Sequence, residues 1–386
     1  MKVLNICMGA PFTEGYTYQD NLLSECQARL GHQVTVLTST RTRDANGAIT
    51  ETMPVDKVMD NGVRLVRLKA PGRLRSFLGI YPGVRKCIET IAPDFIFIHG
   101  LASFVPRAAI AYKRSHPEVK IVADNHQDPG TTYTDRFPFN LQLRLFQRQW
   151  RTWIRHVERI YGTTSWRRTF ARDFYGIPED KLDTLIMGID SENLPTNPAS
   201  VRADVRVEQR IPQNAFLFVS GGKMDRNKHV IEAMKAFSAL PHANARLLLF
   251  GSVLPDIKEE FEGLLAADKR MGYIGYLKSH DIHRYFIAAD FGVFPGRHSV
   301  LWEEAIGCGL PCLFRRYGEC DHTNPCGNAI CIPSPDVQNI KETMEAVASG
   351  GKYLEELKRG AVKAAPMFSY STIAEKSLEA AKACHE

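Results

Sequence analysis

Two lysines stand five residues apart behind a pair of glycines in the segment GGKMDRNKH, residues 221–229. The strand pattern FLFVS precedes it, so Gly221 and Gly222 fall where a strand would turn, and glycines there allow a close approach of the backbone to a ligand. The ammonium groups of Lys223 and Lys228 would each add a charge-assisted hydrogen bond to phosphate, worth about 1.5–3 kcal/mol. We interpret the segment as a diphosphate clamp; the alternative is an ordinary solvated basic loop.

A second segment that suits an anion is PGRHSVLWEEAIGCGLP, residues 295–311. The strand pattern FGVFP ends at Pro295, and Ser299 is predicted to cap a helix running from Val300 through Cys308. The free amides and the positive dipole end of such a helix favour phosphate. Glu303 and Glu304 would lie inside this helix, where carboxylates repel phosphate but suit the hydroxyl groups of a ribose or a sugar.

These residues need a scaffold, and the chain predicts two parallel sheets. Short, nearly all-apolar stretches alternate with helical patterns in the first half (KVLNICM, QVTVLTS, DFIFIHG, KIVADN and RIYGTTS) and again in the second (AFLFVSGG, ARLLLFG, YIGYL and FGVFPG). Strands that are apolar on both faces and separated by helices are typical of doubly wound α/β domains. Ligands of such sheets bind at the carboxyl ends of the strands.

The length of 386 residues fits two domains. We expect a first domain over residues 1–192, a linker over 193–210 where NLPTNPAS has a linker's composition, and a second domain over 211–368. The last segment, 369–386, has a helical pattern and could pack back on the first domain.

Composition and charge narrow the class of protein. With 44% apolar and 24% charged residues and no apolar run of about 18 residues, the sequence predicts a soluble protein without a membrane span. The N-terminus lacks the pattern of a secretory signal, so we expect a cytoplasmic location. Residues 1–190 carry 26 Lys/Arg against 19 Asp/Glu, which places an anionic partner on the first half. No nucleic-acid-binding motif accompanies the charge.

The nine cysteines are an odd number, as free thiols in a reducing compartment would be. A cluster in the second half could be interpreted as a metal site: Cys308, Cys312, Cys320, Cys326 and Cys331, with Asp321 and His322 among them. No two of these cysteines have the CxxC spacing of a zinc ribbon, so we predict no metal there.

The order of these motifs resembles the retaining glycosyltransferases of family 4, which have the GT-B fold of two Rossmann-like domains facing each other across a cleft. The resemblance rests on GGKMDRNKH, LLLFG, GYIGYL, AADFGVFP and EAIGCGLP in the second half. It extends to GHQVTVLTS, PDFIFIHG, IVADNHQD and TSWRRTFARDFYGIPEDKLDTLIMGID in the first half.

The resemblance implies a role for individual residues. Lys223 would take the place of the family's arginine and Lys228 that of its lysine, both on the donor diphosphate beside Gly222. Glu304 matches the acid that holds the nucleotide ribose, although Glu303 could be the functional acid instead. His126 matches a histidine that contacts the transferred sugar, although it could also be a core histidine. Gly9 matches the turn near the donor phosphates.

One acid of the family's pattern is missing. The family has a glutamate four residues after the proline and a second one eight residues further, whereas Pro295 and Glu304 are nine apart. The gap holds Gly296, Arg297, His298 and Ser299, so we expect His298 and nearby amides to contact the sugar or the diphosphate. The departure affects the identity of the sugar more than nucleotide binding.

Two basic regions of the first half suggest the acceptor. A predicted helix near 143–160 has an apolar stripe that includes Trp150 and an arginine stripe that includes Arg148 and Arg151, and the segment GRLRSFLGIYPGV contains Arg73, Arg75 and Phe77. Aromatic residues flanked by cations are typical of surfaces that rest on anionic lipid. The alternative for the helix is that its tryptophans pack on the sheet while its arginines face water.

The resemblance implies a hexosyltransferase that acts with retention on a nucleoside-diphosphate sugar, and we expect UDP rather than GDP as the nucleotide and transfer that needs no metal. The two lysines would replace a metal ion, and no cofactor is expected. The acceptor would be a lipid-linked glycan at the inner face of the membrane, in surface polysaccharide or glycolipid biosynthesis. The alternatives are a sugar-nucleotide 2-epimerase of the same fold and a non-catalytic homologue that binds sugar nucleotides.

Overall fold

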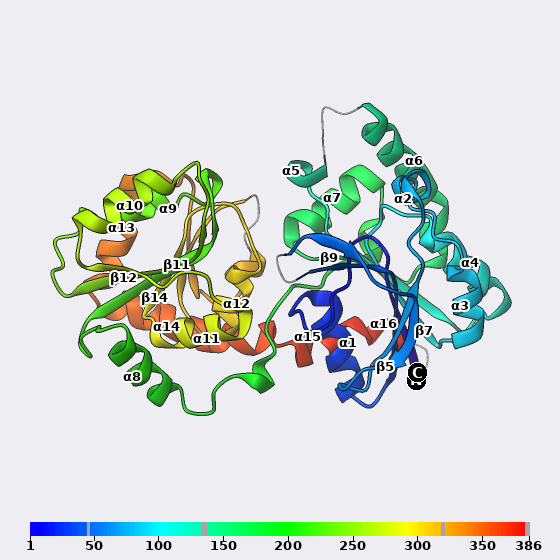
Figure 1. Cartoon of the computed structure of the whole chain (residues 1–386), viewed down its shortest axis with the longest axis horizontal. Coiled ribbons are helices and arrows are strands. Elements are labelled where there is room, and N and C mark those ends of the chain that lie inside the picture. The colour runs from blue at the N-terminus through cyan, green and yellow to red at the C-terminus, as the bar shows by residue number, and fades with distance from the viewer. Residues whose placement is uncertain (45–46, 133–136, 318–320, 383–386) are drawn as a thin grey trace. The chain divides into compact units, whose positions relative to one another are not determined.

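The computed structural model describes residues 1–44, 47–132, 137–317 and 321–382. The chain divides into two compact units, Met1–Met187 with Tyr370–Glu386, and Gly188–Ser369. Each unit is an α/β domain built on one main sheet (Figure 1).

The first unit contains an eight-stranded sheet in the order β10-β9-β8-β7-β1-β2-β6-β5. Its ladders are parallel except that between β5 and β6, which is antiparallel. The strands are β1 (Lys2–Cys7), β2 (Gln33–Ser39), β5 (Val55–Val58), β6 (Arg64–Leu68), β7 (Phe95–His99), β8 (Lys120–Asn125), β9 (Arg159–Gly162) and β10 (Leu182–Thr184). A separate antiparallel pair is formed by β3 (Arg41–Arg43) and β4 (Ile49–Glu51).

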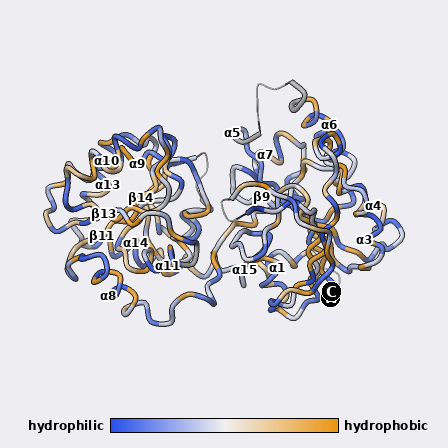
Figure 2. The backbone as a smooth tube through the Cα atoms, in the orientation of Figure 1, coloured by the Kyte–Doolittle hydropathy of each residue, from blue (hydrophilic) through white to orange (hydrophobic). Residues whose placement is uncertain are grey.

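Helices follow most of these strands, as the apolar pattern on both strand faces requires. They are α1 (Gln19–Arg29), α2 (Arg73–Phe77), α3 (Val84–Ile91), α4 (Val105–Ser115), α5 (Pro129–Thr132), α6 (Phe137–Trp153), α7 (Ser165–Tyr175), α15 (Tyr370–Ser377) and α16 (Glu379–Lys382), with short 3-10 turns at Ile154–His156 and Glu179–Lys181. The central strands β1 and β7 are almost wholly buried, and Figure 2 shows the hydrophobic colour concentrated along the strands.

The second unit contains a six-stranded, all-parallel sheet in the order β13-β12-β11-β14-β15-β16. Its strands are β11 (Phe216–Met224), β12 (Ala245–Val253), β13 (Met271–Tyr273), β14 (Phe291–Phe294), β15 (Cys312–Arg315) and β16 (Ala329–Ile332). Its helices are α8 (Pro198–Glu208), α9 (Val230–Ser238), α10 (Lys258–Ala267), α11 (Ser279–Ala288), α12 (Leu301–Gly307), α13 (Val337–Ala348) and α14 (Lys352–Ala364). The 3-10 turns of this unit are at Ser191–Asn193, Arg226–Lys228, Asp321–Thr323 and Ala365–Phe368.

The expected linker over residues 193–210 contains helix α8. The side chain of Asn197 accepts a hydrogen bond from the Ser200 amide at the start of this helix, and Pro198 occupies its first turn. Arg206 is fully buried and pairs with Asp290 at 2.9 Å. The Asn, Pro and Ser content that predicts a linker is therefore the cap of a packed helix here.

The last two helices, α15 and α16, belong to the first unit. Tyr370, Ile373 and Leu378 lie in the same apolar cluster as residues of β1 and β7. Gln27 of α1 donates a hydrogen bond to Ser377 at 2.9 Å. The chain thus leaves the first unit after Met187 and re-enters it at Tyr370.

Candidate functional site

The glycines at the end of β11 are required by close packing. A side chain at Gly221 would lie 2.4 Å from the carbonyl oxygen of Phe250, and one at Gly222, where φ is +114°, would lie 2.8 Å from Leu301 of α12. Lys223 follows them as an exposed residue. The carboxyl end of this central strand therefore brings open backbone and one cation to the edge of the sheet.

The second lysine lies directly against the loop that follows β14. Lys228 Nζ donates a hydrogen bond to the Arg297 carbonyl at 2.6 Å, and the Arg297 amide donates to the Asn227 carbonyl at 2.8 Å. A Cβ at Gly296 would lie 2.2 Å from the backbone of Lys228, so only glycine fits at this position. The structure thus joins the predicted clamp to the PGRH segment, although 60 or more residues separate them in the sequence.

Burial lowers the pKa of this lysine. Loss of solvent, together with the nearby Arg297 cation, lowers the pKa of Lys228 to about 8, while Asp225 and Glu303 oppose the shift. Its ammonium group is therefore charged at neutral pH but only just so. A bound phosphate would restore the stability of the charged form.

Glu303 is a fully buried carboxylate between two imidazoles. Its Oε1 lies 2.8 Å from His298 Nε2 and 3.5 Å from His322 Nε2. Burial alone would raise the pKa of Glu303, but the two histidines outweigh it and hold the pKa at about 2. Oε2 of Glu303 is buried and has no hydrogen-bond partner among the described residues. His298 also packs edge-to-face on Trp302 at 5.2 Å.

The neighbouring Glu304 behaves in the opposite way. Burial, and then the charge of Glu303, raise the pKa of Glu304 to about 8, so that its carboxyl group is protonated at neutral pH. It is 5% exposed, and its Oε2 lies 3.8 Å from His283 Nε2. Its predicted role toward a ribose stays a prediction.

The predicted start of this helix is wrong in detail. Helix α12 begins at Leu301, its N-cap position is Val300, and no side chain caps it. Ser299 contributes only its carbonyl, which accepts from the Trp302 amide at 3.0 Å. The helix has seven residues, and both of its glutamates are buried.

In the first unit His126 follows the end of β8, and its side chain is 37% exposed. Its Nε2 lies 3.1 Å from Oδ2 of Asp124, which is fully buried. The same oxygen lies 3.0 Å from Nδ1 of His99, and Oδ1 accepts from the Gly100 amide at 2.8 Å. His126 is therefore a half-exposed residue held from behind, not a core histidine.

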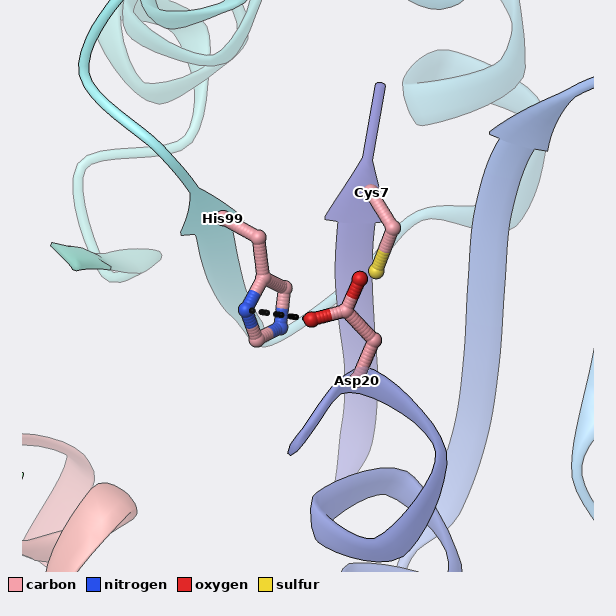
Figure 3. Close-up of side chains that lie close together, drawn as sticks. All are labelled: Cys7, Asp20 and His99. Carbon is pink, nitrogen blue, oxygen red and sulfur yellow. Dashed lines mark ion pairs between the residues drawn. The ribbon is translucent and has the colours of Figure 1, made fainter. Parts of the chain in front are cut away.

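His99 is itself held between two carboxylates. Its Nδ1 lies 3.5 Å from Asp20 Oδ1, and Figure 3 shows the Asp20 carboxylate between the His99 ring and the Cys7 thiol. Burial would lower the pKa of His99, but Cys7, Asp124 and Asp20 around it outweigh burial and raise the pKa well above 6.5. Burial raises the pKa of Cys7 to about 12, so the thiol stays protonated.

Three groups of donor atoms lie within 4.8 Å of one another in the described part of the chain, and each could be considered for a metal ion: Cys7, Asp20 and His99; His99, Asp124 and His126; and His298, Glu303 and His322. A proton on His99 already balances the nearby carboxylates, so we assign the first two groups as ion-pair networks. The second-half cysteines belong to none of these groups, and Cys320 lies outside the described residues.

The predicted acceptor residues differ in their exposure to solvent. Arg73, Arg75 and Phe77 are exposed on α2, and Arg148 and Arg151 are exposed on α6. Trp150 is fully buried, and its indole N–H donates to the Leu101 carbonyl at 2.8 Å, so its prediction as a membrane-surface residue is wrong. The apolar stripe of α6 faces the core, because its period matches the helix face that covers the sheet.

Gly9 follows β1 and is exposed. The nearest atom to a Cβ there would be the His99 carbonyl oxygen at 3.8 Å, so nothing described in its surroundings demands glycine. Its proximity to a donor phosphate stays a prediction.

Sequence reasoning missed His99, Asp124, Asp20 and the contact of His322 with Glu303. A signal was present for two of them, because His99 and Asp124 are polar residues that directly follow apolar runs near the carboxyl ends of their strands. Their contact depends on the pairing of β7 with β8, which aligns these two residues.

Among the described residues, no helix is long and apolar enough to cross a membrane. No curated protein matches the sequence. Two family models do match it, the "Glycosyl transferase 4-like domain" over residues 15–188 and "Glycosyl transferases group 1" over residues 201–364.

Solved structures share the fold over nearly the whole chain. A sucrose-phosphate synthase from Thermosynechococcus elongatus is 16% identical with a TM-score of 0.69, covering 99% of this chain and 98% of that one. Anabaena HepE in complex with UDP is 14% identical with a TM-score of 0.72, covering 99% and 100%. A glycosyltransferase from Rickettsia africae is 12% identical with a TM-score of 0.70, covering 99% and 98%. These matches confirm the predicted fold and family: the chain belongs to the GT-B glycosyltransferases, with a 4-like first domain and a group 1 second domain.

Proposed function

We propose that the protein transfers a hexose from a nucleoside-diphosphate sugar, with UDP favoured, to a lipid-linked glycan with retention of anomeric configuration. The observation that carries the donor part is the joined pair of loops at the edge of the second sheet, where Lys228 is tied to the Arg297 carbonyl beside Gly296. A half-buried cation is suited to a diphosphate, because a charge-assisted hydrogen bond to phosphate is stronger than a neutral one. The solved neighbour HepE, which binds UDP and UDP-glucose, supports UDP as the nucleotide.

Within this proposal each residue has one role. Lys223, Lys228 and the amides near Gly222, Ser299 and Val300 hold the diphosphate and stabilise the charge on the leaving phosphate. Glu304 binds the ribose, with Glu303 holding His298 toward the sugar. His126 contacts the transferred sugar, and Gly9 lies near the donor phosphates, as the family resemblance implies. Because the two lysines supply the positive charge, we propose that no metal ion is required.

The acceptor part rests on the exposed surface around α2. Leu74, which lies between Arg73 and Arg75, is 71% exposed, and Phe77 and Ile80 after them are each 39% exposed. A neighbouring groove of about 430 Å³ is lined by apolar residues such as Tyr81 and Phe104, and by Arg85 and Arg107. Exposed apolar side chains among cations favour an anionic lipid surface. This supports a peripheral enzyme at the inner face of the membrane, in surface polysaccharide or glycolipid assembly.

The deciding experiment is a panel of UDP-, GDP-, dTDP- and ADP-sugars with EDTA present, in which nucleotide release is followed with and without membrane lipid extract. Release that depends on the extract is the expected result. Interconversion of the donor without an acceptor would indicate the 2-epimerase, and inactivity with every donor would indicate a non-catalytic homologue. The anomeric coupling constant of the product, measured by proton NMR, tests retention.

Vesicle binding tests the membrane part separately. Changing Arg73 and Arg75 to glutamate should weaken binding to phosphatidylglycerol vesicles by about fivefold or more per residue, since each cation near an anionic surface contributes about 1 kcal/mol. The matched control is the same change at Arg148 and Arg151, whose exposed stripe on α6 has its apolar face in the core. Equal loss in both pairs would show a general charge effect and no docking surface at α2.

A further inference from the structure

Asp124 accepts hydrogen bonds from three donors at the end of β8. Oδ1 accepts a hydrogen bond from the Gly100 amide at 2.8 Å. Oδ2 lies 3.0 Å from His99 Nδ1 and 3.1 Å from His126 Nε2. Burial would raise the pKa of Asp124, but the two histidines outweigh it and hold the pKa well below its usual range. An ionised carboxylate can only accept, so both ring nitrogens that face it carry hydrogen.

The loop around His126 is fixed by its neighbours. Asn125 Oδ1 accepts from the Gln127 amide at 3.2 Å, and its Nδ2 donates to the carbonyls of Gln127 and Arg167, both at 2.9 Å. Asp128 pairs with Arg167 at 3.3 Å. The backbone on either side of His126 is therefore pinned, while its ring keeps an exposed face.

We propose that Asp124 is a positioning residue that holds His126 in the tautomer with hydrogen on Nε2, so that Nδ1 is the atom presented to the sugar as a hydrogen-bond acceptor. This inference rests on the proposed function for the role of His126, but the tautomer itself does not. His99 has a supporting role, because its Nδ1 faces the same oxygen of Asp124 at 3.0 Å and lies 3.5 Å from Asp20, so it helps to fix the carboxylate that faces His126.

The substitution Asp124→Asn gives a sharp test, because it reverses the hydrogen-bond direction. The Gly100 amide still needs an acceptor, so the asparagine oxygen stays on that side and its NH₂ group faces the two histidines. An NH₂ group donates, and His126 Nε2 must then accept, which moves the ring hydrogen to Nδ1. A wrong tautomer of this kind removes most of the catalytic contribution of a histidine in other enzymes.

The first measurement is long-range proton–nitrogen NMR on the full chain labelled with ¹⁵N-histidine, with His126→Gln identifying the signals of His126. The expected pattern is a protonated Nε2 and an unprotonated Nδ1 in the wild type, exchanged in Asp124→Asn. Asp128→Asn is the matched control, since it removes a carboxylate from the same loop and should leave the pattern unchanged. A wild-type ring with hydrogen on Nδ1 would overturn the proposal, and this result does not depend on Asp124→Asn being folded.

The second measurement uses the donor and acceptor that support transfer. An asparagine at position 126 places its amide near the position of Nδ1, whereas a glutamine places it near Nε2. His126→Asn should therefore retain at least about tenfold more of kcat than His126→Gln, within the 10²–10⁴-fold range of one positioned group, while the donor KM changes little. Asp124→Asn should lower kcat by about 100-fold.

The outcomes separate the inference from the proposed function. Equal kcat in His126→Asn and His126→Gln, with the predicted tautomer in place, would overturn Nδ1 as the working atom. Absence of transfer by the wild type would remove the proposed function, and the NMR pattern would still decide whether Asp124 fixes the ring.

Discussion

Each unit of the molecule contains a buried carboxylate between two imidazoles, and the two carboxylates differ in how many of their oxygens have a hydrogen-bond partner. Asp124 lies between His99 and His126, and a backbone amide takes its second oxygen. Glu303 lies between His298 and His322, but its Oε2 has no hydrogen-bond partner among the described residues. A buried oxygen without a partner costs free energy.

The difference indicates two kinds of site, one around Asp124 and one around Glu303. The first is complete without a ligand and fixes the direction of a ring. The second has an unused acceptor next to a half-buried lysine and a protonated glutamate, so we expect a donor group of the ligand to complete it. Three experiments on the second unit test whether Glu303, Lys228 and Glu304 behave as this contrast predicts.

The largest effect is expected from Glu303→Gln. The pKa of Glu303 is about 2 in the folded protein and about 4.5 in the unfolded chain, so its ionised form stabilises the fold above pH 4.5 and this contribution is lost as the pH falls toward 2. Removing the charge should lower the free energy of unfolding by about 3 kcal/mol at pH 7. Urea unfolding at pH 7, 4 and 3 measures it. The deficit of the variant should stay nearly constant from pH 7 to about pH 4.5 and shrink clearly by pH 3, and a deficit that is unchanged at pH 3 would contradict an ionised Glu303.

The next effect concerns Lys228. Lys228→Ala should weaken UDP binding by about 10–100-fold, because a charge-assisted hydrogen bond to phosphate contributes about 1.5–3 kcal/mol. Lys228→Arg keeps the cation and serves as the matched control, and Lys223→Ala should cost less because Lys223 is exposed. Isothermal titration calorimetry measures the affinities. If UDP binds Lys228→Ala as tightly as the wild type, the diphosphate lies elsewhere.

The smallest effect is a link between UDP binding and pH at Glu304. Its carboxyl group is protonated at neutral pH, with a pKa of about 8, and the hydroxyls of a ribose would favour its ionised form. UDP affinity should therefore rise between pH 6 and 8 by up to about tenfold per pH unit, with release of a proton.

Lys228 loses its charge near the same pH, which works in the opposite direction. The titration is therefore best made in the Lys228→Arg variant, whose cation does not titrate there, and compared with Lys228→Arg combined with Glu304→Gln. Affinity that is flat with pH in both would remove Glu304 from the ribose site.

Sequence reasoning reached the fold because the apolar pattern of strands buried on both faces can be recognised in the sequence. It assigned the Lys228 segment and residues 295–311 to one anionic ligand because both follow parallel strands, whereas the direct contact of Lys228 with Arg297 appears only in the structure. It failed where one pattern has two meanings. NLPTNPAS suits a linker and also the capped start of α8, and the Trp150 stripe suits a membrane face and also a core face. The contact of His99 with Asp124 is set by strand register, which composition does not encode.

Because the chain returns to the first unit at Tyr370, the first unit can finish folding only after the second unit has been synthesised. Tyr370, Ile373 and Leu378 complete an apolar cluster with Val3, Phe97 and other residues near the N-terminus. During synthesis the second unit, Gly188–Ser369, is finished before this cluster can close, although the first unit begins earlier on the ribosome. A fragment that ends at Met187 would expose that cluster, whereas Gly188–Ser369 is continuous and can be expressed as one segment. A fragment that is meant to contain the first unit therefore has to include helices α15 and α16 as well as the first sheet.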